Sequence, residues 1–285
     1  MASPTGPSFL TNSRMPPQHI TSRQNSRVKE AAKLRLARQR QQQGRFVIDG
    51  ARELLRAISS GIEIVEAFIC ESRCRDAETQ QAAEAVSNSH AAVATVTEEV
   101  LEKLCFGERT GGVLAIARTP VRTLSQLKLP AQPLVAVIEG VEKPGNVGAI
   151  LRSADGAGVD AMVIADPRTD LFNPNAIRAS LGTIFAPNVC TATSVETQAW
   201  LRSQKITAFA ARPDATQLYT EVDYRDGAAI VLGSEAEGLT DAWSGGAATA
   251  IGLPMRGIAD SLNVSATAVV LFYEAQRQRG FPPGH

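Results

Sequence analysis

Three short segments of this 285-residue chain combine glycine, amide, hydroxyl and charged side chains in patterns that could hold a ligand. The first, EGVEKPGNVGAILRSADGAG (139–158), turns through Pro144 and Gly145 and predicts a helix with Asn146 as its N-cap. Arg152 follows nearly two turns into that helix. The glycine spacing matches neither the dinucleotide fingerprint nor the Walker motif. An ordinary strand–turn–helix junction with an incidental arginine explains this segment equally well.

The second segment, IVLGSEAEGL (230–239), places Gly233 at the carboxyl end of an apolar strand. Ligands of open α/β sheets bind at this edge, and a glycine there lets a ligand approach the backbone closely. The alternative interpretation is a glycine turn beside a solvated Glu235.

The third segment, IGLPMRGIADSLNVSATAVVLFYEAQRQR (251–279), has three small polar residues at the start of a predicted helix: Ser261, Asn263 and Ser265. Side chains at such a position can offer hydrogen bonds to a ligand. Further along this helix, Val269, Val270, Phe272 and Tyr273 fall within little more than one turn. A helix that is apolar on both sides needs burial on both sides, so we expect a homodimer that uses it.

Alternating strands and helices must position these segments. Residues 1–18 are rich in Ser and Pro and are expected to be disordered. Residues 19–118 are expected to form a small α/β domain. Residues 119–133 contain prolines and are expected to act as a linker. In the first domain helices are predicted over 22–43, 51–59, 77–86 and 97–104, and strands over 45–49, 67–70, 91–96 and 112–118.

Residues 134–285 are expected to form a second α/β domain with stronger strand signals. Residues 134–139 (LVAVIE) form a continuous apolar run, which is typical of a strand buried on both faces of a parallel sheet. Further strands are predicted over 161–165, 207–211, 228–233 and 250–253, and helices over 146–156, 194–204 and 261–279.

Composition restricts the function classes. With 44% hydrophobic and 20% charged residues the chain is expected to fold, and no apolar run reaches the ~18–20 residues of a membrane span. Four scattered cysteines without a C-x-x-C pair favour free thiols in a reducing compartment over a disulfide or zinc site. The acid-poor start resembles an organellar transit peptide, but its prolines oppose an amphipathic helix, so a cytoplasmic location is expected.

The charge distribution is strongly asymmetric. Residues 1–45 contain nine basic side chains and one acid, Glu30, so this segment carries +8 and the other 240 residues carry −8. A basic arm on an acidic body indicates contact with a polyanion, most simply nucleic acid. A solvated helix face with a bias of charge is the alternative.

Taken together, the three motifs resemble one family. N-x-x-x-x-x-R, then LGSE-x-x-G, then P-M-x-G-x-x-x-SLNVS is similar to the SpoU (TrmH-like) branch of the SPOUT RNA methyltransferases, over about residues 134–280. Residues 20–118 more loosely resemble that family's small substrate-binding domain, of ribosomal L30e type. The resemblance implies a parallel α/β sheet with a deep trefoil knot and a homodimer. It also implies methyl transfer from S-adenosylmethionine (AdoMet) to a ribose 2′-hydroxyl of structured RNA, with ribosomal RNA favoured over transfer RNA and no metal required.

The resemblance also assigns roles by position. It implies that AdoMet is bound by Gly233, Gly238, Leu253, Met255 and Leu262. It implies a catalytic set of Asn146, Arg152, Glu235, Ser261 and Asn263. The pair Leu253–Pro254 stands where many relatives have Ile-Pro. Because a guanidinium stays protonated in proteins, the proton of the attacking hydroxyl passes either to a strongly perturbed Arg152 or to an RNA phosphate.

Two other functions fit the sequence less well. An RNA-binding module with an inactive methyltransferase domain is disfavoured because all five residues of the implied catalytic set are present. A nucleotide-dependent oxidoreductase is disfavoured because the chain lacks a dinucleotide fingerprint and an acidic ribose partner at the expected distance.

Overall fold

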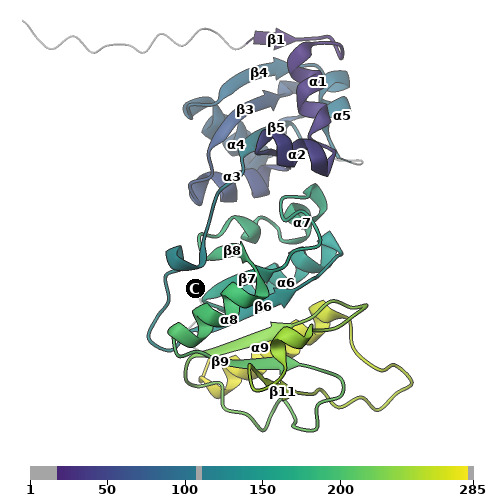
Figure 1. The fold of residues 1–285 in the computed structure, drawn as a ribbon. Coiled ribbons are helices and arrows are strands. Elements are labelled where there is room, and N and C mark those ends of the chain that lie inside the picture. The colour runs from purple at the N-terminus through teal and green to yellow at the C-terminus, as the bar shows by residue number, and fades with distance from the viewer. Residues whose placement is uncertain (1–17, 107–110, 282–285) are drawn as a thin grey trace, which may run out of the picture.

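The computed structural model describes residues 18–106 and 111–281, and these form two sheets stacked end to end along the molecule (Figure 1). The segment expected to be disordered lies outside the described residues except for Gln18, which begins a strand. Within the described ranges no helix is long and apolar enough to cross a bilayer.

The first sheet has five strands in the order β1-β4-β3-β5-β2. They are β1 (Gln18–Ile20), β2 (Arg45–Asp49), β3 (Ile64–Ile69), β4 (Ala92–Val96) and β5 (Val113–Arg118). The helices of this half are α1 (Ser26–Lys33), α2 (Ala37–Gln43), α3 (Ala51–Ser59), α4 (Ala77–Asn88) and α5 (Glu98–Leu104). The small α/β architecture was predicted, whereas β1 and the early start of β3 were not.

The single helix predicted over 22–43 is wrong, because the chain breaks between α1 and α2. Leu34 is buried in the core, while Leu36 adopts an extended conformation and is 64% exposed. The buried Arg40 side chain donates to the backbone carbonyls of Leu34 (2.7 Å) and Arg35 (2.9 Å). It thereby satisfies carbonyl groups left free at the end of α1, so the break is stabilised by tertiary contacts.

The second sheet is parallel throughout, in the order β11-β9-β10-β6-β7-β8. Its strands are β6 (Leu134–Glu139), β7 (Ala161–Ala165), β8 (Val189–Ala192), β9 (Thr207–Ala211), β10 (Ala228–Leu232) and β11 (Thr249–Ile251). Its helices are α6 (Pro144–Gly156), α7 (Pro174–Ala179), α8 (Ser194–Ser203) and α9 (Val264–Gln278). Every residue of β6 is buried, which confirms the prediction of a strand covered on both faces. The trefoil knot stays a prediction.

Two strands of this sheet bring distant motifs to one place. β6 and β10 pair in register, with Ile138 opposite Leu232. Because both strands run in the same direction, the first and second motifs leave the sheet at the same edge.

The helix after β6 begins earlier than predicted. Its first residue is Pro144 and its N-cap is Lys143, so the prediction of Asn146 as the N-cap is wrong. Proline is favoured at the first helical position because it lacks the N–H that would go unpaired there. A Cβ on Gly148 would lie 2.5 Å from the carbonyl oxygen of Ala176, so this glycine lets α6 pack directly against α7.

The segment expected to be a linker packs along the second sheet. Leu124, Leu127 and Leu129 contact the buried cluster on one face of that sheet. Arg122 donates to the carbonyl oxygens of Phe185 and Ala186. These contacts fix the connection to the second half.

The two halves also contact each other directly. The rings of Phe46 and Phe172 stack with centroids 4.5 Å apart, and Arg40 forms an ion pair with Asp170. One buried hydrophobic cluster contains residues from both halves. The first sheet is therefore held in a defined position relative to the second.

Candidate functional site

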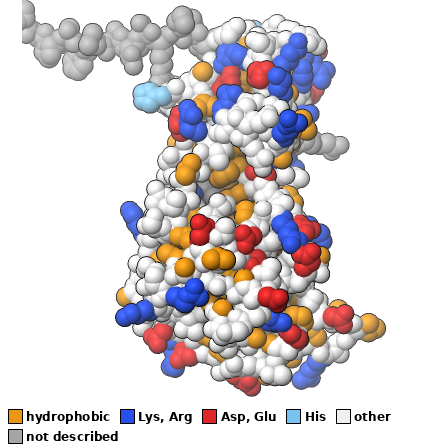
Figure 2. Space-filling view, viewed as in Figure 1, with side chains coloured by type: hydrophobic (Ala, Val, Ile, Leu, Met, Phe, Trp, Pro, Cys, Tyr) orange, Lys and Arg blue, Asp and Glu red, His pale blue; other side chains and the backbone are white. Residues whose placement is uncertain are grey.

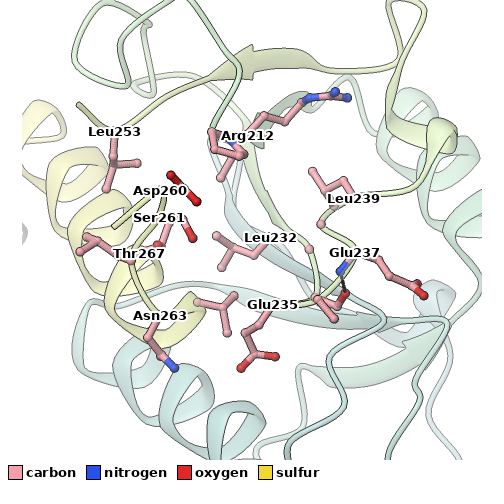
Figure 3. A pocket seen from close by; sticks show the side chains of 18 of the residues that line it. Arg212, Leu232, Glu235, Glu237, Leu239, Leu253, Asp260, Ser261, Asn263 and Thr267 are labelled. Carbon is pink, nitrogen blue, oxygen red and sulfur yellow. Dashed lines mark hydrogen bonds between the residues drawn. The ribbon is translucent and has the colours of Figure 1, made fainter. Parts of the chain in front are cut away.

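A cavity of about 730 Å³ opens at the carboxyl edge of β9, β10 and β11 (Figure 3). Three connecting segments form most of its wall: residues 211–214 after β9, 233–239 after β10, and 253–263 before α9. This volume is typical of a site for a small molecule or cofactor.

Eight of the ten site residues predicted from the sequence line this cavity. The lining includes Gly233, Glu235, Gly238, Leu253, Met255, Ser261, Leu262 and Asn263. Two of the predicted residues, Asn146 and Arg152, are not part of the lining.

The loop after β10 is closed on itself. Ser234 and Gly238 exchange two backbone hydrogen bonds of 3.1 and 3.0 Å, and the Glu237 N–H donates to Ser234 Oγ at 3.1 Å. A Cβ on Gly233 would lie 2.2 Å from the carbonyl carbon of Gly238. Position 233 therefore requires glycine because the backbone of Gly238 returns close to it. The sequence had suggested a different reason, the approach of a ligand to the Gly233 backbone.

Asn146 joins the first motif to the second. As the third residue of α6 it lies outside the cavity wall, but its Nδ2 donates to Glu235 Oε1. Figure 3 shows the side chains of Glu235 and Asn263 pointing to the same side of the cavity. The three motifs thus converge on one small region of the surface.

Asn263 is the N-cap of α9. Its Oδ1 accepts from the N–H of Ser265 at 2.9 Å and from Ser265 Oγ at 2.6 Å. Because the oxygen is committed to the cap, the Nδ2 amino group is the part of the side chain available to a ligand.

Arg152 is not brought into the cavity. It is exposed on α6, two turns from Asn146, and forms no hydrogen bond or ion pair with the residues that the structure describes. The guanidinium of Arg152 is therefore available for contacts outside this chain.

The cavity is rich in carboxylates. Asp214, Glu235, Glu237 and Asp260 line it, against only Lys143 and Arg212. A hydrogen bond from Arg212 lowers the pKa of Asp214, and one from Arg168 lowers the pKa of Glu237. Each of these two carboxylates is ionised but paired with an arginine, so the negative charge that the wall offers a ligand comes from Glu235 and Asp260, against Lys143.

The sequence analysis missed Arg212, Asp214 and Asp260. A usable signal existed for Arg212, since it directly follows the predicted strand 207–211 at the edge where ligands bind. Asp260 lies inside the third motif, at an unspecified position just before Ser261, and nothing in its spacing distinguishes it from a solvated loop residue. Across residues 18–106 and 111–281, no three His, Cys, Asp or Glu side chains are grouped so as to hold a metal ion.

The basic segment is folded into the first half. Of its side chains, Arg27 pairs with Glu66 at 2.6 Å, Lys33 pairs with Glu30, and Arg40 pairs with Asp170. Three others are exposed and form no ion pair with the described residues: Arg23, Lys29 and Arg38. Figure 2 shows Lys and Arg side chains gathered at the end of the molecule where α1 and α5 lie. Arg14 lies outside the described residues.

Comparison with known proteins identifies the family. Residues 133–273 match the model described as the SpoU rRNA Methylase family, and residues 25–115 match the MRM3-like substrate binding domain. A crystal structure of an RNA 2′-O ribose methyltransferase is 42% identical, covers 92% of this chain and 99% of its own, and superposes with a TM-score of 0.79. The chain belongs to the SpoU rRNA methylase family. The resemblance drawn from the three motifs is confirmed.

Named members of the SpoU family are similar along nearly the whole chain. The 23S rRNA (uridine(2479)-2′-O)-methyltransferase of Streptomyces viridochromogenes is 27% identical over 92% of this chain and 93% of its own. The 23S rRNA (guanosine(2553)-2′-O)-methyltransferase RlmP of Bacillus subtilis (strain 168) is 25% identical over 90% and 98%. The SpoU methyltransferase AviRb from Streptomyces viridochromogenes, solved in complex with AdoMet, has the same fold, with a TM-score of 0.82, 23% identity, and coverage of 90% and 98%.

We predict that Gly233→Ala weakens AdoMet binding at least tenfold. The added methyl group would collide with the Gly238 backbone and displace the loop that forms one cavity wall. Isothermal calorimetry measures the affinity. The control is Gly111→Ala, because a Cβ at Gly111 meets nothing within 4 Å and Gly111 does not line the cavity. Equal affinities for the two variants would show that this loop does not shape the binding site.

Proposed function

We propose that this protein transfers the methyl group of AdoMet to a ribose 2′-hydroxyl of ribosomal RNA. The observation that carries the proposal is the convergence of all three SpoU motifs on the rim of one cavity, where Asn146 bonds to Glu235. The relatives described above are 23S rRNA 2′-O-methyltransferases, which supports the same activity.

The cavity suits AdoMet as the methyl donor. Gly233, Gly238, Leu253, Met255 and Leu262 would hold it, with the tight loop after β10 offering backbone groups and the leucines offering apolar contact. The side chains of Glu235 and Asp260, which form no ion pair with the described residues, would suit the positive charge of a sulfonium. When bound, AdoMet supplies an electrophilic methyl group, so the chemistry requires no metal ion.

The substrate hydroxyl would be oriented by residues at the rim. Glu235 is fixed by Asn146, and the Nδ2 amino group of Asn263 and the hydroxyl of Ser261 lie on the same rim. Holding the hydroxyl in line with the methyl group converts a poor nucleophile into a well-placed one. Arg152 would bind an RNA phosphate next to the reacting ribose, since a guanidinium matches phosphate geometry.

A homodimer would explain how Arg152 reaches the site. Leu262 and, within α9, Ala266, Val269 and Tyr273 form one exposed apolar stripe, with Val269 39% and Tyr273 45% exposed. The Tyr273 hydroxyl donates to the carbonyl of Gly156, one helical turn beyond Arg152 on α6. A second copy packed on this stripe would lie next to Arg152. We therefore propose that the dimer buries the stripe and completes the site around Arg152.

The first half would bind the RNA substrate. We propose that residues 19–118 position the RNA through Arg23, Lys29 and Arg38, which have no ion pairs among the described residues. Bacterial relatives named for 23S rRNA support the cytoplasmic location expected from the sequence.

We predict that Arg152→Ala abolishes methyl transfer to ribosomal RNA while AdoMet affinity stays within about tenfold, or ~1.4 kcal/mol. The reason is that Arg152 lies outside the cofactor cavity. Transfer of labelled methyl groups measures the first effect and calorimetry the second. The matched control is Arg202→Ala, an exposed arginine on α8 outside the cavity. Normal turnover of Arg152→Ala would remove this arginine from the mechanism.

A second prediction concerns the dimer. Placing a carboxylate in the stripe by Val269→Glu should give a monomer, because burying an unpaired charge costs several kcal/mol. Light scattering at micromolar concentration measures the mass. A monomeric wild-type protein, or a variant with unchanged mass, would refute the proposed interface.

The third prediction concerns RNA binding. Deleting the basic segment would also remove the core residues Val28, Ala31 and Leu34, so substitutions are the cleaner test. The triple variant Arg23→Gln, Lys29→Gln, Arg38→Gln should lower RNA affinity and reduce the slope of log affinity against log salt by about 2 to 3. The double variant Arg202→Gln, Arg225→Gln on the second half is the control. An unchanged slope in the triple variant would contradict the assignment.

A further inference from the structure

A buried carboxylate lies behind the cofactor loop. Glu139 is the last residue of β6 and is 2% exposed. Its Oε1 accepts from Ser194 Oγ, from Thr240 Oγ1 at 2.9 Å and from Trp243 Nε1 at 2.9 Å. Its Oε2 accepts from the Thr240 backbone N–H at 2.8 Å. The three partners come from the first residue of α8 and from the segment that follows the second motif.

These bonds hold the second motif at its far end. Thr240 directly follows Leu239, which lines the cavity (Figure 3). The near end of the loop is fixed by the pairing of β10 with β6, and its middle by the Ser234–Gly238 hydrogen bonds. The hydrogen bonds of Glu139 to Thr240 and Trp243 therefore fix the chain where it leaves the cavity.

Glu139 is suited to this task because its bonded partners are all neutral donors. A carboxylate is acceptor-only, so both of its oxygens can accept from converging N–H and O–H groups. A glutamine would turn an amino group toward some of these donors. The donors would lose their acceptor inside the protein, where unpaired polar groups are costly.

We propose that Glu139 is a positioning residue that holds residues 233–240 in the conformation that binds AdoMet. It does not line the cavity, so it acts through Thr240 and Trp243 and not by touching the cofactor. The inference rests on the AdoMet site proposed above.

The test compares Glu139→Gln with Glu142→Gln. Glu142 lies on the same connection after β6, but it is exposed and pairs with Arg168 at 3.0 Å. In ligand-free protein, hydrogen exchange of the amides at 235–240 should become at least tenfold faster in Glu139→Gln and stay unchanged in Glu142→Gln. The dissociation constants of AdoMet and of S-adenosylhomocysteine should both rise about tenfold, while kcat at saturating AdoMet stays within about threefold.

A second variant covers the case in which Glu139→Gln fails to fold. Trp243→Phe removes the indole N–H donor and leaves a smaller aromatic ring in its place, so it should give the same pattern at smaller size. Unchanged hydrogen exchange at 235–240 in the folded variants would overturn the proposal. A loss of affinity for AdoMet but not for S-adenosylhomocysteine would also overturn it, because it would show that the charge of Glu139 acts on the sulfonium. If wild-type protein bound no AdoMet, the proposed function would fail, and hydrogen exchange would still decide whether Glu139 anchors the loop.

Discussion

The in-register parallel pairing of β6 with β10 is the constraint on which the rest of the site depends. It places Ile138 beside Leu232, so Glu139 and Gly233 leave the sheet next to each other although they are far apart in the sequence. One strand then leads to the helix that carries Asn146, and the other to the loop that carries Glu235. The hydrogen bond between these two side chains is a direct consequence of the strand pairing.

At this edge of the sheet, hydrogen bonds hold the backbone segments that form the cavity wall in place. The loop after β10 closes through its own hydrogen bonds, and the cap at Asn263 fixes the start of α9. A site built this way is organised before a ligand arrives, which lowers the entropy cost of binding. The contact of Phe46 with Phe172 fixes the first half relative to the second, so an RNA bound there as proposed would meet the cavity in a defined orientation.

The sequence predicted best where burial dominates. The apolar runs of β6, β7, β9 and β10 gave nearly correct bounds because each strand is wholly or mostly buried. It failed at α7 and β8, which are short and whose packing partners are distant in the chain. The break after α1 depends on Arg40, a tertiary contact that no local pattern shows. The motif residues were found through family resemblance, whereas Glu139 and Asp260 needed three-dimensional placement. The position of Arg152 outside the cavity was equally invisible, because helical spacing does not show which face of α6 meets the site.

The central claim is that this chain methylates a ribose of ribosomal RNA, and mapping of ribose methylation tests it most directly. Mass spectrometry of ribosomal RNA from a strain lacking the protein would be compared with the parent strain and with a complemented strain. We expect that one 2′-O-methylated nucleotide disappears in the deletion strain and returns on complementation. An unchanged set of ribose methylations in all three strains would contradict it.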